Sequence, residues 1–409
     1  MTTASNNFTA ADEQTSNRRV RDARFLKRVR TRRQKVLLAL IIASVLAVCG
    51  ALWPFTNVHL QALAVLKQIS GQPVPWIAAK LVGGPVTTEE IQISGSGGPI
   101  RARLYRPVNK PDVPGLIVLH GLHHLGVDEP RLLEFSRAMA SCGLQVLTPE
   151  LPGIRDYSID QNSVRVIGES TKWFAQKTNH PVGVVGLSFS GGLALVAAAD
   201  PAYQQDFKFL FAVGSQDNMD HVEKFFLTDT ETRPDGSIEH LHAHEYGVLV
   251  LEYQHLEDFV PASDIAAIRP VLQQHLYEDK AAEIAATQKL NPKQKSEVLH
   301  LFDSRSPTTL ATLAANEPRH REEMESLSPH GKLKGLTIPV YLLHGHADNV
   351  IPSAETLWIA SELPHSTPRA VLLSPVLSHL DMDGAKPSAW DQWRLVHFIA
   401  QVMNAAQTN

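Results

Sequence analysis

The chain has 409 residues, of which 44% are hydrophobic and 20% are charged, and its formal net charge is -4. This hydrophobic content excludes a disordered or collagen-like chain, and a mean hydropathy of -0.11 excludes a protein with many membrane spans. The two cysteines, Cys49 and Cys142, cannot form a disulfide scaffold. We expect both to be free thiols.

The near-neutral total hides a charge asymmetry between the two ends. Residues 1–35 contain ten Lys or Arg against three Asp or Glu, a net charge of +7, which leaves -11 for the rest. A basic tail on an acidic body indicates contact with nucleic acid or with a membrane. Because an apolar segment follows directly, we interpret residues 1–35 as a cytoplasmic tail that sets topology, and we expect no nucleic-acid partner.

An uncharged stretch without proline covers residues 36–53. As a helix it would be about 27 Å long, close to the roughly 30 Å of a bilayer core. Trp53 and Phe55 stand where interfacial aromatic residues are common, and the positive flank orients the N-terminus toward the cytoplasm. We predict a single transmembrane signal anchor over residues 36–55 that contacts membrane lipid. The body would then be extracytoplasmic, periplasmic or extracellular in a bacterium.

This segment has two other interpretations. A cleaved signal peptide has a shorter basic region and an apolar region of about 7–15 residues, and the weak cleavage site here lies near residues 49–51. Residues 46–49 resemble a bacterial lipoprotein box, but Val48 occupies the position of the small residue that precedes the cysteine. Both features favour an uncleaved anchor.

After a connector over residues 56–88, the body alternates between strand-like and helical patterns. Residues 91–93 and 101–105 alternate with period two around a glycine-rich turn, which predicts an antiparallel hairpin. Unalternating apolar runs, typical of strands buried on both faces, follow at 116–119, 144–147, 182–185, 209–213, 340–343 and 370–373. Helical patterns cover 130–141, 161–178, 191–200, 353–363 and 388–405. Together they predict an α/β fold with a mostly parallel sheet.

The interval 214–335 interrupts this alternation. It has helical stretches around 264–287 and 293–302, and only Val248–Leu251 reads as a buried strand. A connection of this length is too long for a simple loop. We therefore predict a mainly helical cap insertion within a core formed by residues 89–213 and 336–409.

The sharpest motif is Gly186-Leu187-Ser188-Phe189-Ser190, which lies between an apolar strand and a helical stretch. It resembles the nucleophile elbow of the α/β-hydrolase superfamily, usually G-x-S-x-G, with Ser190 in place of the second glycine. The resemblance covers most of residues 90–405 apart from the insertion, and it implies an α/β-hydrolase fold with Ser188 as the nucleophile. A glycine-rich turn with a serine that caps a helix is the structural alternative.

Three further segments resemble the same superfamily and occur in its order. Residues 338–352 resemble the strand and loop that present the acid, which implies Asp348. The loop after the last apolar strand implies His379 as the general base. A strand that ends in His-Gly before Leu122 implies an oxyanion hole formed by the backbone N–H groups of Leu122 and Phe189.

These roles follow the chemistry of acyl transfer. A serine hydroxyl is a weak nucleophile, so a neutral imidazole must take its proton and a carboxylate must hold the ring in the correct tautomer. Backbone N–H groups then stabilise the charge on the former carbonyl oxygen. Asp217, which follows the strand at 209–213, is the runner-up for the acid, because some members of the superfamily place it there.

The alternating histidines His240, His242 and His244 would point the same way on a strand and could bind zinc. A second cluster of ligands does not accompany them in the sequence. We therefore expect neither a metal nor a cofactor, and we interpret the histidines as part of the insertion near the mouth of the active site, where they could contact substrate.

The sequence thus favours a membrane-anchored serine hydrolase, a carboxylesterase that acts on a small-molecule ester or acyl substrate. A non-catalytic binding domain of the same fold is the alternative from another class. Amidase, thioesterase and peptidase activities also stay open, because the chemistry at serine is common to all of them.

Overall fold

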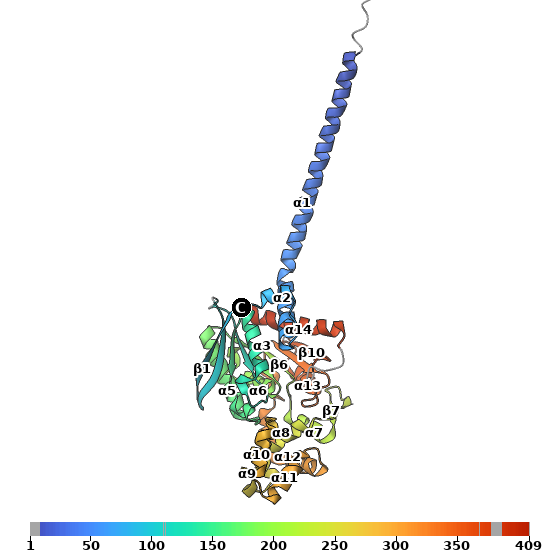
Figure 1. Ribbon diagram of the computed structural model, residues 1–409. Coiled ribbons are helices and arrows are strands. Elements are labelled where there is room, and N and C mark those ends of the chain that lie inside the picture. Colours follow the sequence, from blue (N-terminus) through green and yellow to red (C-terminus); the bar gives the residue numbers. More distant parts are fainter. Residues whose placement is uncertain (1–8, 109, 111, 368, 378–386, 409) are drawn as a thin grey trace, which may run out of the picture. The chain divides into compact units, whose positions relative to one another are not determined.

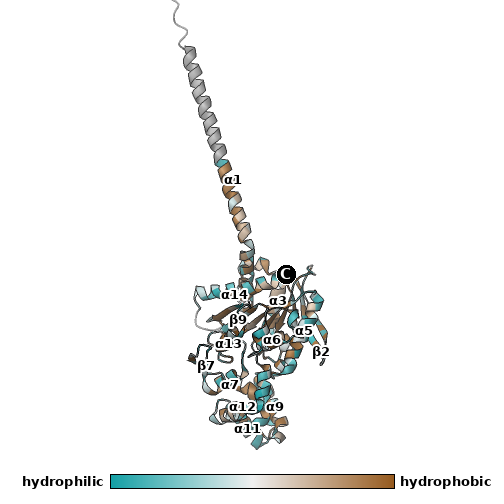
Figure 2. Cartoon of the chain, turned by 180° about the vertical axis from the view of Figure 1, so that it is seen from behind, coloured by the Kyte–Doolittle hydropathy of each residue, from teal (hydrophilic) through white to brown (hydrophobic). Residues whose placement is uncertain are grey.

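The computed structural model describes residues 9–108, 110, 112–367, 369–377 and 387–408, with side chains from residue 34 onward (Figure 1). The chain divides into two compact units, Met1–Asn57 and Val58–Asn409. Helix α1 (Thr9–Ile69) forms the first unit and contributes its last turns to the second. Its apolar stretch, brown in Figure 2, is exposed and is long and apolar enough to cross a membrane. The prediction of an apolar N-terminal helix is confirmed.

The second unit is built on an eight-stranded sheet in the order β1-β2-β4-β3-β5-β6-β9-β10. The strands are β1 (Val86–Gly95), β2 (Gly98–Pro107), β3 (Gly115–Leu119), β4 (Gln145–Pro149), β5 (Val182–Leu187), β6 (Phe207–Val213), β9 (Val340–Gly345) and β10 (Arg369–Ser374). β2 is antiparallel to both of its neighbours, and the strands from β4 to β10 are parallel. This confirms the predicted hairpin and the mostly parallel sheet.

Helices cover both faces of the sheet. One face carries residues 58–69 of α1, with α2 (Trp76–Leu81), α3 (Pro130–Ser141) and α14 (Ala389–Gln407). The other carries α5 (Gln161–Thr178), α6 (Phe189–Ala199), α13 (Ala354–Glu362) and the short α4 (Pro152–Arg155). Neighbouring strand residues such as Val184 and Val185 enter different core clusters, because side chains alternate across a sheet. These helices confirm the predicted crossovers.

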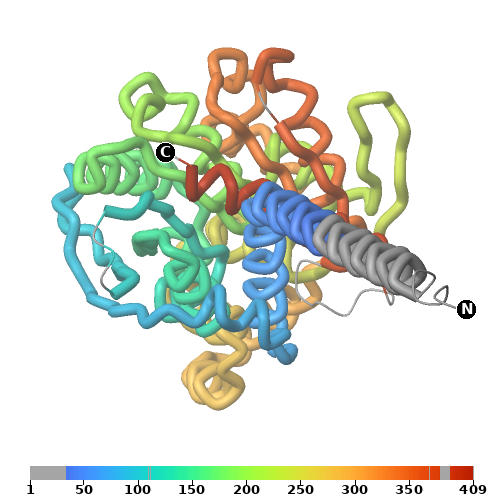
Figure 3. The backbone as a smooth tube through the Cα atoms, turned by 90° about the horizontal axis from the view of Figure 1, so that it is seen from above, coloured from blue at the N-terminus to red at the C-terminus, as the bar shows by residue number. Residues whose placement is uncertain are grey.

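Residues 58–69 belong to this core. Ala62, Ala64 and Val65 are fully buried against the helices of the α3 and α14 face. Gln407 at the end of α14 donates a hydrogen bond to the side chain of Gln61, 2.8 Å away. Figure 3 shows α14, in red, beside the end of the blue helix α1, its residues 58–69. The first and last helices of the unit therefore pack side by side.

Residues between β6 and β9 contribute to two buried clusters, the core cluster of the α5 and α6 face and a second cluster formed mostly by residues of this interval. The elements of this interval are α7 (Met219–Thr228), β7 (Thr230–Thr232), β8 (Ile238–His240), α8 (Glu245–Gln254), α9 (Ala262–Leu276), α10 (Lys280–Gln288), α11 (Pro292–Phe302) and α12 (Pro307–Leu327). The strand interpretation of Val248–Leu251 is wrong, because this run lies within α8. All four residues are buried, so the run shows no periodicity that separates a helix from a strand.

Candidate active site

Ser188 stands in a strained turn between β5 and α6. Its backbone has φ 57° and ψ -137°, a region that residues other than glycine rarely adopt. The Ser188 N–H donates to the carbonyl of Val213, 2.8 Å away, and its own carbonyl accepts from the N–H of Gly191 and the hydroxyl of Ser215. These bonds hold the serine at the carboxyl end of the sheet.

Small residues make this turn possible. A Cβ at Gly191 would lie 2.0 Å from Ser215 Oγ, and one at Gly186 would lie 2.4 Å from Gly191 Cα. Ser190 is fully buried, donates its hydroxyl hydrogen to the carbonyl of Leu187 (2.7 Å) and accepts from the N–H of the same residue (3.0 Å). Ser190, which stands where the elbow motif usually has glycine, therefore stabilises the turn through these two hydrogen bonds.

Leu122 and Phe189, the two predicted oxyanion donors, both lie in segments next to Ser188. A Cβ built on Gly121, the residue before Leu122, would lie 3.5 Å from Ser188 Cβ, so this loop passes directly beside the serine. Phe189 is the first residue of α6, where backbone N–H groups lack partners within the helix and carry partial positive charge. Both N–H groups thus belong to segments that adjoin Ser188.

His120 fixes the peptide that carries the Leu122 N–H. The ring is buried, and its Nε2 accepts from the N–H of Leu151 at 3.0 Å, so the proton is on Nδ1, which donates to the carbonyl of Gly121 at 3.0 Å. Burial lowers the pKa of His120, which keeps the ring neutral. Because a trans peptide directs its C=O and N–H in opposite directions, the Leu122 N–H points away from the ring.

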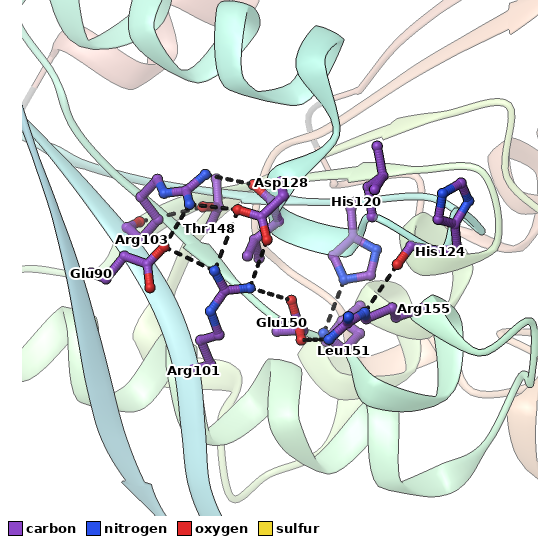
Figure 4. Close-up of polar contacts among 12 residues, drawn as sticks. Glu90, Arg101, Arg103, His120, His124, Asp128, Thr148, Glu150, Leu151 and Arg155 are labelled. Atoms are coloured by element: carbon purple, nitrogen blue, oxygen red, sulfur yellow. Dashed lines mark hydrogen bonds and ion pairs between the residues drawn. The ribbon is translucent and has the colours of Figure 1, made fainter.

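A network of charges holds the loop that follows His120 (Figure 4). Arg101 on β2 contacts Asp128 at 2.9 Å and Glu150 at 3.2 Å, and Arg103 pairs with the same aspartate. Arg155 contacts Glu150 at 2.7 Å and donates to the carbonyl of residue 124. The hydrogen bond from Arg101 lowers the pKa of Asp128, so the carboxylate stays charged. Sequence reasoning missed this network, since its members are far apart along the chain.

Asp348 follows β9 in a buried loop. Only 2% of its surface is exposed, and its Oδ1 accepts from the N–H groups of Val350 and Ile351, both at 3.0 Å. His344 Nε2 donates to the carbonyl of Ile351 at 2.9 Å and lies 3.4 Å from Asp348 Oδ2. The carboxylate is therefore held in one orientation by its own loop.

Several of the predicted site residues line one cavity of about 580 Å³. Ser188, Leu122 and Asp348 all line it. The predicted base, His379, lies in 378–386, outside the described residues. Leu377, the residue just before this segment, lines the same cavity. The structure thus brings three of the predicted site residues to one cavity, and Phe189 follows Ser188 directly.

The runner-up acid, Asp217, faces a different group of residues. It is fully buried; its Oδ2 lies 3.2 Å from Nδ1 of His330, and its N–H donates to Glu355 at 2.9 Å. Burial, and then the nearby Glu355, raise the pKa of Asp217 to about 9. Among the described residues, the cavity lining includes Asp348 and does not include Asp217. The geometry therefore favours Asp348.

The alternating histidines of the insertion have separate surroundings. His240 ends β8, and the exposed His242 lies 3.1 Å from Asp229. His244 accepts from the N–H of Tyr246 and caps the start of α8. Within the described chain, Tyr246 lines the cavity and these three histidines do not.

Comparison with known proteins gives similarities at low sequence identity. No family model and no curated protein matches the chain. Among solved structures, an esterase of Pyrobaculum calidifontis is 17% identical, with a TM-score of 0.46 over 81% of this chain and 90% of that one. An acylaminoacyl peptidase of Pyrococcus horikoshii is 10% identical, with a TM-score of 0.46 over 83% and 44%. A thermostable carboxylesterase from a metagenomic library is 14% identical, with a TM-score of 0.42 over 81% and 93%.

The second unit has a distinctive order of strands and a distinctive turn after β5. The strand order places one antiparallel hairpin beside a parallel sheet, and β5 leads through the strained Ser188 into α6. An exposed nucleophile position on a sharp strand-to-helix turn at the carboxyl edge of the sheet is the mark of this architecture. The second unit of the chain has the α/β-hydrolase fold.

Proposed function

We propose that the protein is a membrane-anchored serine hydrolase, a carboxylesterase that acts through an acyl-enzyme on Ser188. The observation that carries the proposal is the strained backbone of Ser188 beside a cavity that Asp348 and Leu122 also line. A strained turn of this kind costs roughly 1–3 kcal/mol of backbone strain, which persists where the surrounding structure enforces it. The strain presents the hydroxyl at the end of the sheet.

In the proposed reaction, His379 takes the proton of Ser188 while Oγ attacks the ester carbonyl. Asp348 orients the ring and stabilises its protonated form, and the N–H groups of Leu122 and Phe189 donate to the developing oxyanion. The C–O bond of the ester then breaks, and the alcohol leaves with the proton from His379. Water, deprotonated by the same ring, releases the acid and restores the serine.

Labelling with a fluorophosphonate probe tests the nucleophile. We expect the full chain in detergent to form an adduct on the peptide that carries Ser188 and to hydrolyse p-nitrophenyl acetate. Ser188→Ala should lose both, whereas Ser361→Ala, at an exposed serine of α13, should keep both. Labelling that survives Ser188→Ala would sink the assignment, and a wild-type chain that reacts with neither reagent would favour a non-catalytic binding domain.

The acid and the base have separate variants. Asp348→Asn should preserve the conformation of the loop but stabilise the wrong tautomer of His379. We expect kcat to fall by a factor on the order of 10⁴. His379→Ala should reduce the rate by a similar or larger factor. Activity within tenfold of wild type in either variant would remove that residue from the mechanism. Parallel assays with the p-nitroanilide and thioester of the same acid separate the esterase from amidase and thioesterase alternatives.

For location, we propose that residues 36–55 span the membrane with the N-terminus in the cytoplasm. The support is the exposed apolar part of α1 and the +7 charge of residues 1–35. A reporter enzyme that folds only outside the cytoplasm, fused after Asn409, should be active. Activity of a cytoplasm-only reporter at the same position would reverse the orientation.

A further inference from the structure

The cavity beside Ser188 continues into the helix layer of the α3 and α14 face. Its floor consists of side chains from three neighbouring parallel strands, among them Phe211 and Leu343. Its roof comes from α3, α14 and the last turns of α1, which contribute Val65, Leu66 and Ile69. Protein cores are normally packed with few voids larger than a water molecule. A cavity of about 580 Å³ between the sheet and the helices is therefore not a packing defect. Its volume is typical of a ligand-binding site.

We propose that this cavity binds the acyl chain of the substrate, and that residues 65–69, which follow the proposed membrane segment, set the chain length that fits. The proposal rests on the serine-hydrolase function above and names its substrate class. Aliphatic and aromatic side chains form most of the wall, which suits a hydrocarbon.

The position of the cavity favours the acyl side of the ester. Once Ser188 Oγ has bonded to the carbonyl carbon and the ester C–O bond has broken, the alcohol must leave, whereas the acyl group stays bonded to the serine. The cavity, which three core helices cover, can hold the acyl group while that group stays bonded to Ser188. Polar groups of the cavity, such as His123, Glu129 and Arg131, come from the loop and helix start that follow Leu122.

Leu66 is the best position to probe, because it lines the cavity, is half-buried and lies outside the elbow and the oxyanion loop. Each methylene that enters the cavity should raise kcat/KM by up to roughly fourfold until the space is full. Leu66→Phe fills part of the space and should shorten the preferred chain, and Leu66→Ala should lengthen it. Leu60→Phe is the matched control, since Leu60 packs on the same core cluster but is not part of the described cavity wall.

The test uses the full chain in lipid nanodiscs with p-nitrophenyl acetate and p-nitrophenyl decanoate. We expect Leu66→Phe to lower the decanoate-to-acetate ratio of kcat/KM by roughly tenfold or more, Leu66→Ala to raise it, and Leu60→Phe to leave it within twofold. An equal ratio in all four proteins would overturn the proposal. Fatty acid released from the nanodisc lipid would identify membrane lipid as the source of the chain, and its absence would identify soluble esters.

Binding of decanoate, measured by isothermal titration calorimetry on the same proteins, separates this proposal from the proposed function. If no ester is hydrolysed but decanoate binds and Leu66→Phe weakens binding by roughly tenfold or more, the acyl cavity stands and the hydrolase proposal fails. If esters are hydrolysed but Leu66→Phe changes neither the ratio nor decanoate binding, the hydrolase stands and the acyl cavity is refuted.

Discussion

Glu252, on α8 of the insertion, makes stability depend on pH in a way that one substitution can test. The side chain is fully buried, and neither carboxylate oxygen has a hydrogen-bond partner among the described residues. Burial, helped by the charge of Asp303, raises the pKa of Glu252 to about 9. A neutral amide in the same place, as in Glu252→Gln, removes this titration.

The magnitude follows from the two pKa values. The carboxyl of Glu252 has an ordinary pKa of 4.5, so the unfolded chain loses the proton near pH 4.5 while the folded chain keeps it until about pH 9. The free energy of unfolding therefore has its full value below pH 4.5. It falls by about 1.4 kcal/mol for each pH unit between pH 4.5 and about pH 9. At pH 7 the free energy of unfolding should be lower by about 3 kcal/mol than with a neutral group.

Thermal unfolding at pH 5 and pH 8, followed by circular dichroism, measures the effect. Glu252→Gln should raise Tm by roughly 6 °C or more at pH 8 and change it little at pH 5. The control is Glu257→Gln, an exposed glutamate five residues further along, which should not change Tm at either pH. An equal shift at both pH values would show that packing, and not the proton, is responsible, and would refute the reasoning.

Three further changes address the site. His120→Phe removes both hydrogen bonds of the ring and should lower kcat for p-nitrophenyl acetate by roughly tenfold or more with little change in KM, and an unchanged kcat would contradict a positioning role. Gly191→Ala places a methyl group 2.0 Å from Ser215 Oγ, so it should lower the free energy of unfolding by about 1–3 kcal/mol in a urea titration, and a second change, Ser215→Gly, should restore part of it. Asp217→Asn should raise Tm at pH 8 more than at pH 5, because burial raises the pKa of Asp217, and should keep hydrolysis within about twofold. A loss near 10⁴ would instead give it the role proposed for Asp348.

Local sequence patterns predicted the sheet and its crossovers because each of them depends on neighbouring residues. Alternation around a glycine turn predicted the β1–β2 hairpin, and unbroken apolar runs predicted parallel strands with two buried faces. The elbow at Ser188 was also visible, since small residues must flank so tight a turn. For each of these features, the residues that determine it lie within about ten positions of one another in the sequence.

Other features depend on contacts that no local pattern reveals. The run Val248–Leu251 was read as a strand because four buried apolar residues fit either structure, and only its packing within α8 decides. The sequence predicted a connector over residues 56–88, yet not that Val65 within it would line the cavity beside Ser188. The hydrogen bonds of His120 to Gly121 and Leu151 likewise require the position of β4 relative to β3, which sequence spacing does not give.

The contact between Gln61 and Gln407 joins residues 346 positions apart in the chain. During synthesis, the helix that contains Gln61 leaves the ribosome long before its partner α14 has been made. The apolar surface around Ala62 and Val65 that α14 covers therefore stays uncovered until α14 has been made. A chain that ends before residue 389 would leave that surface exposed, so a premature stop ahead of α14 should yield a product that aggregates or is degraded.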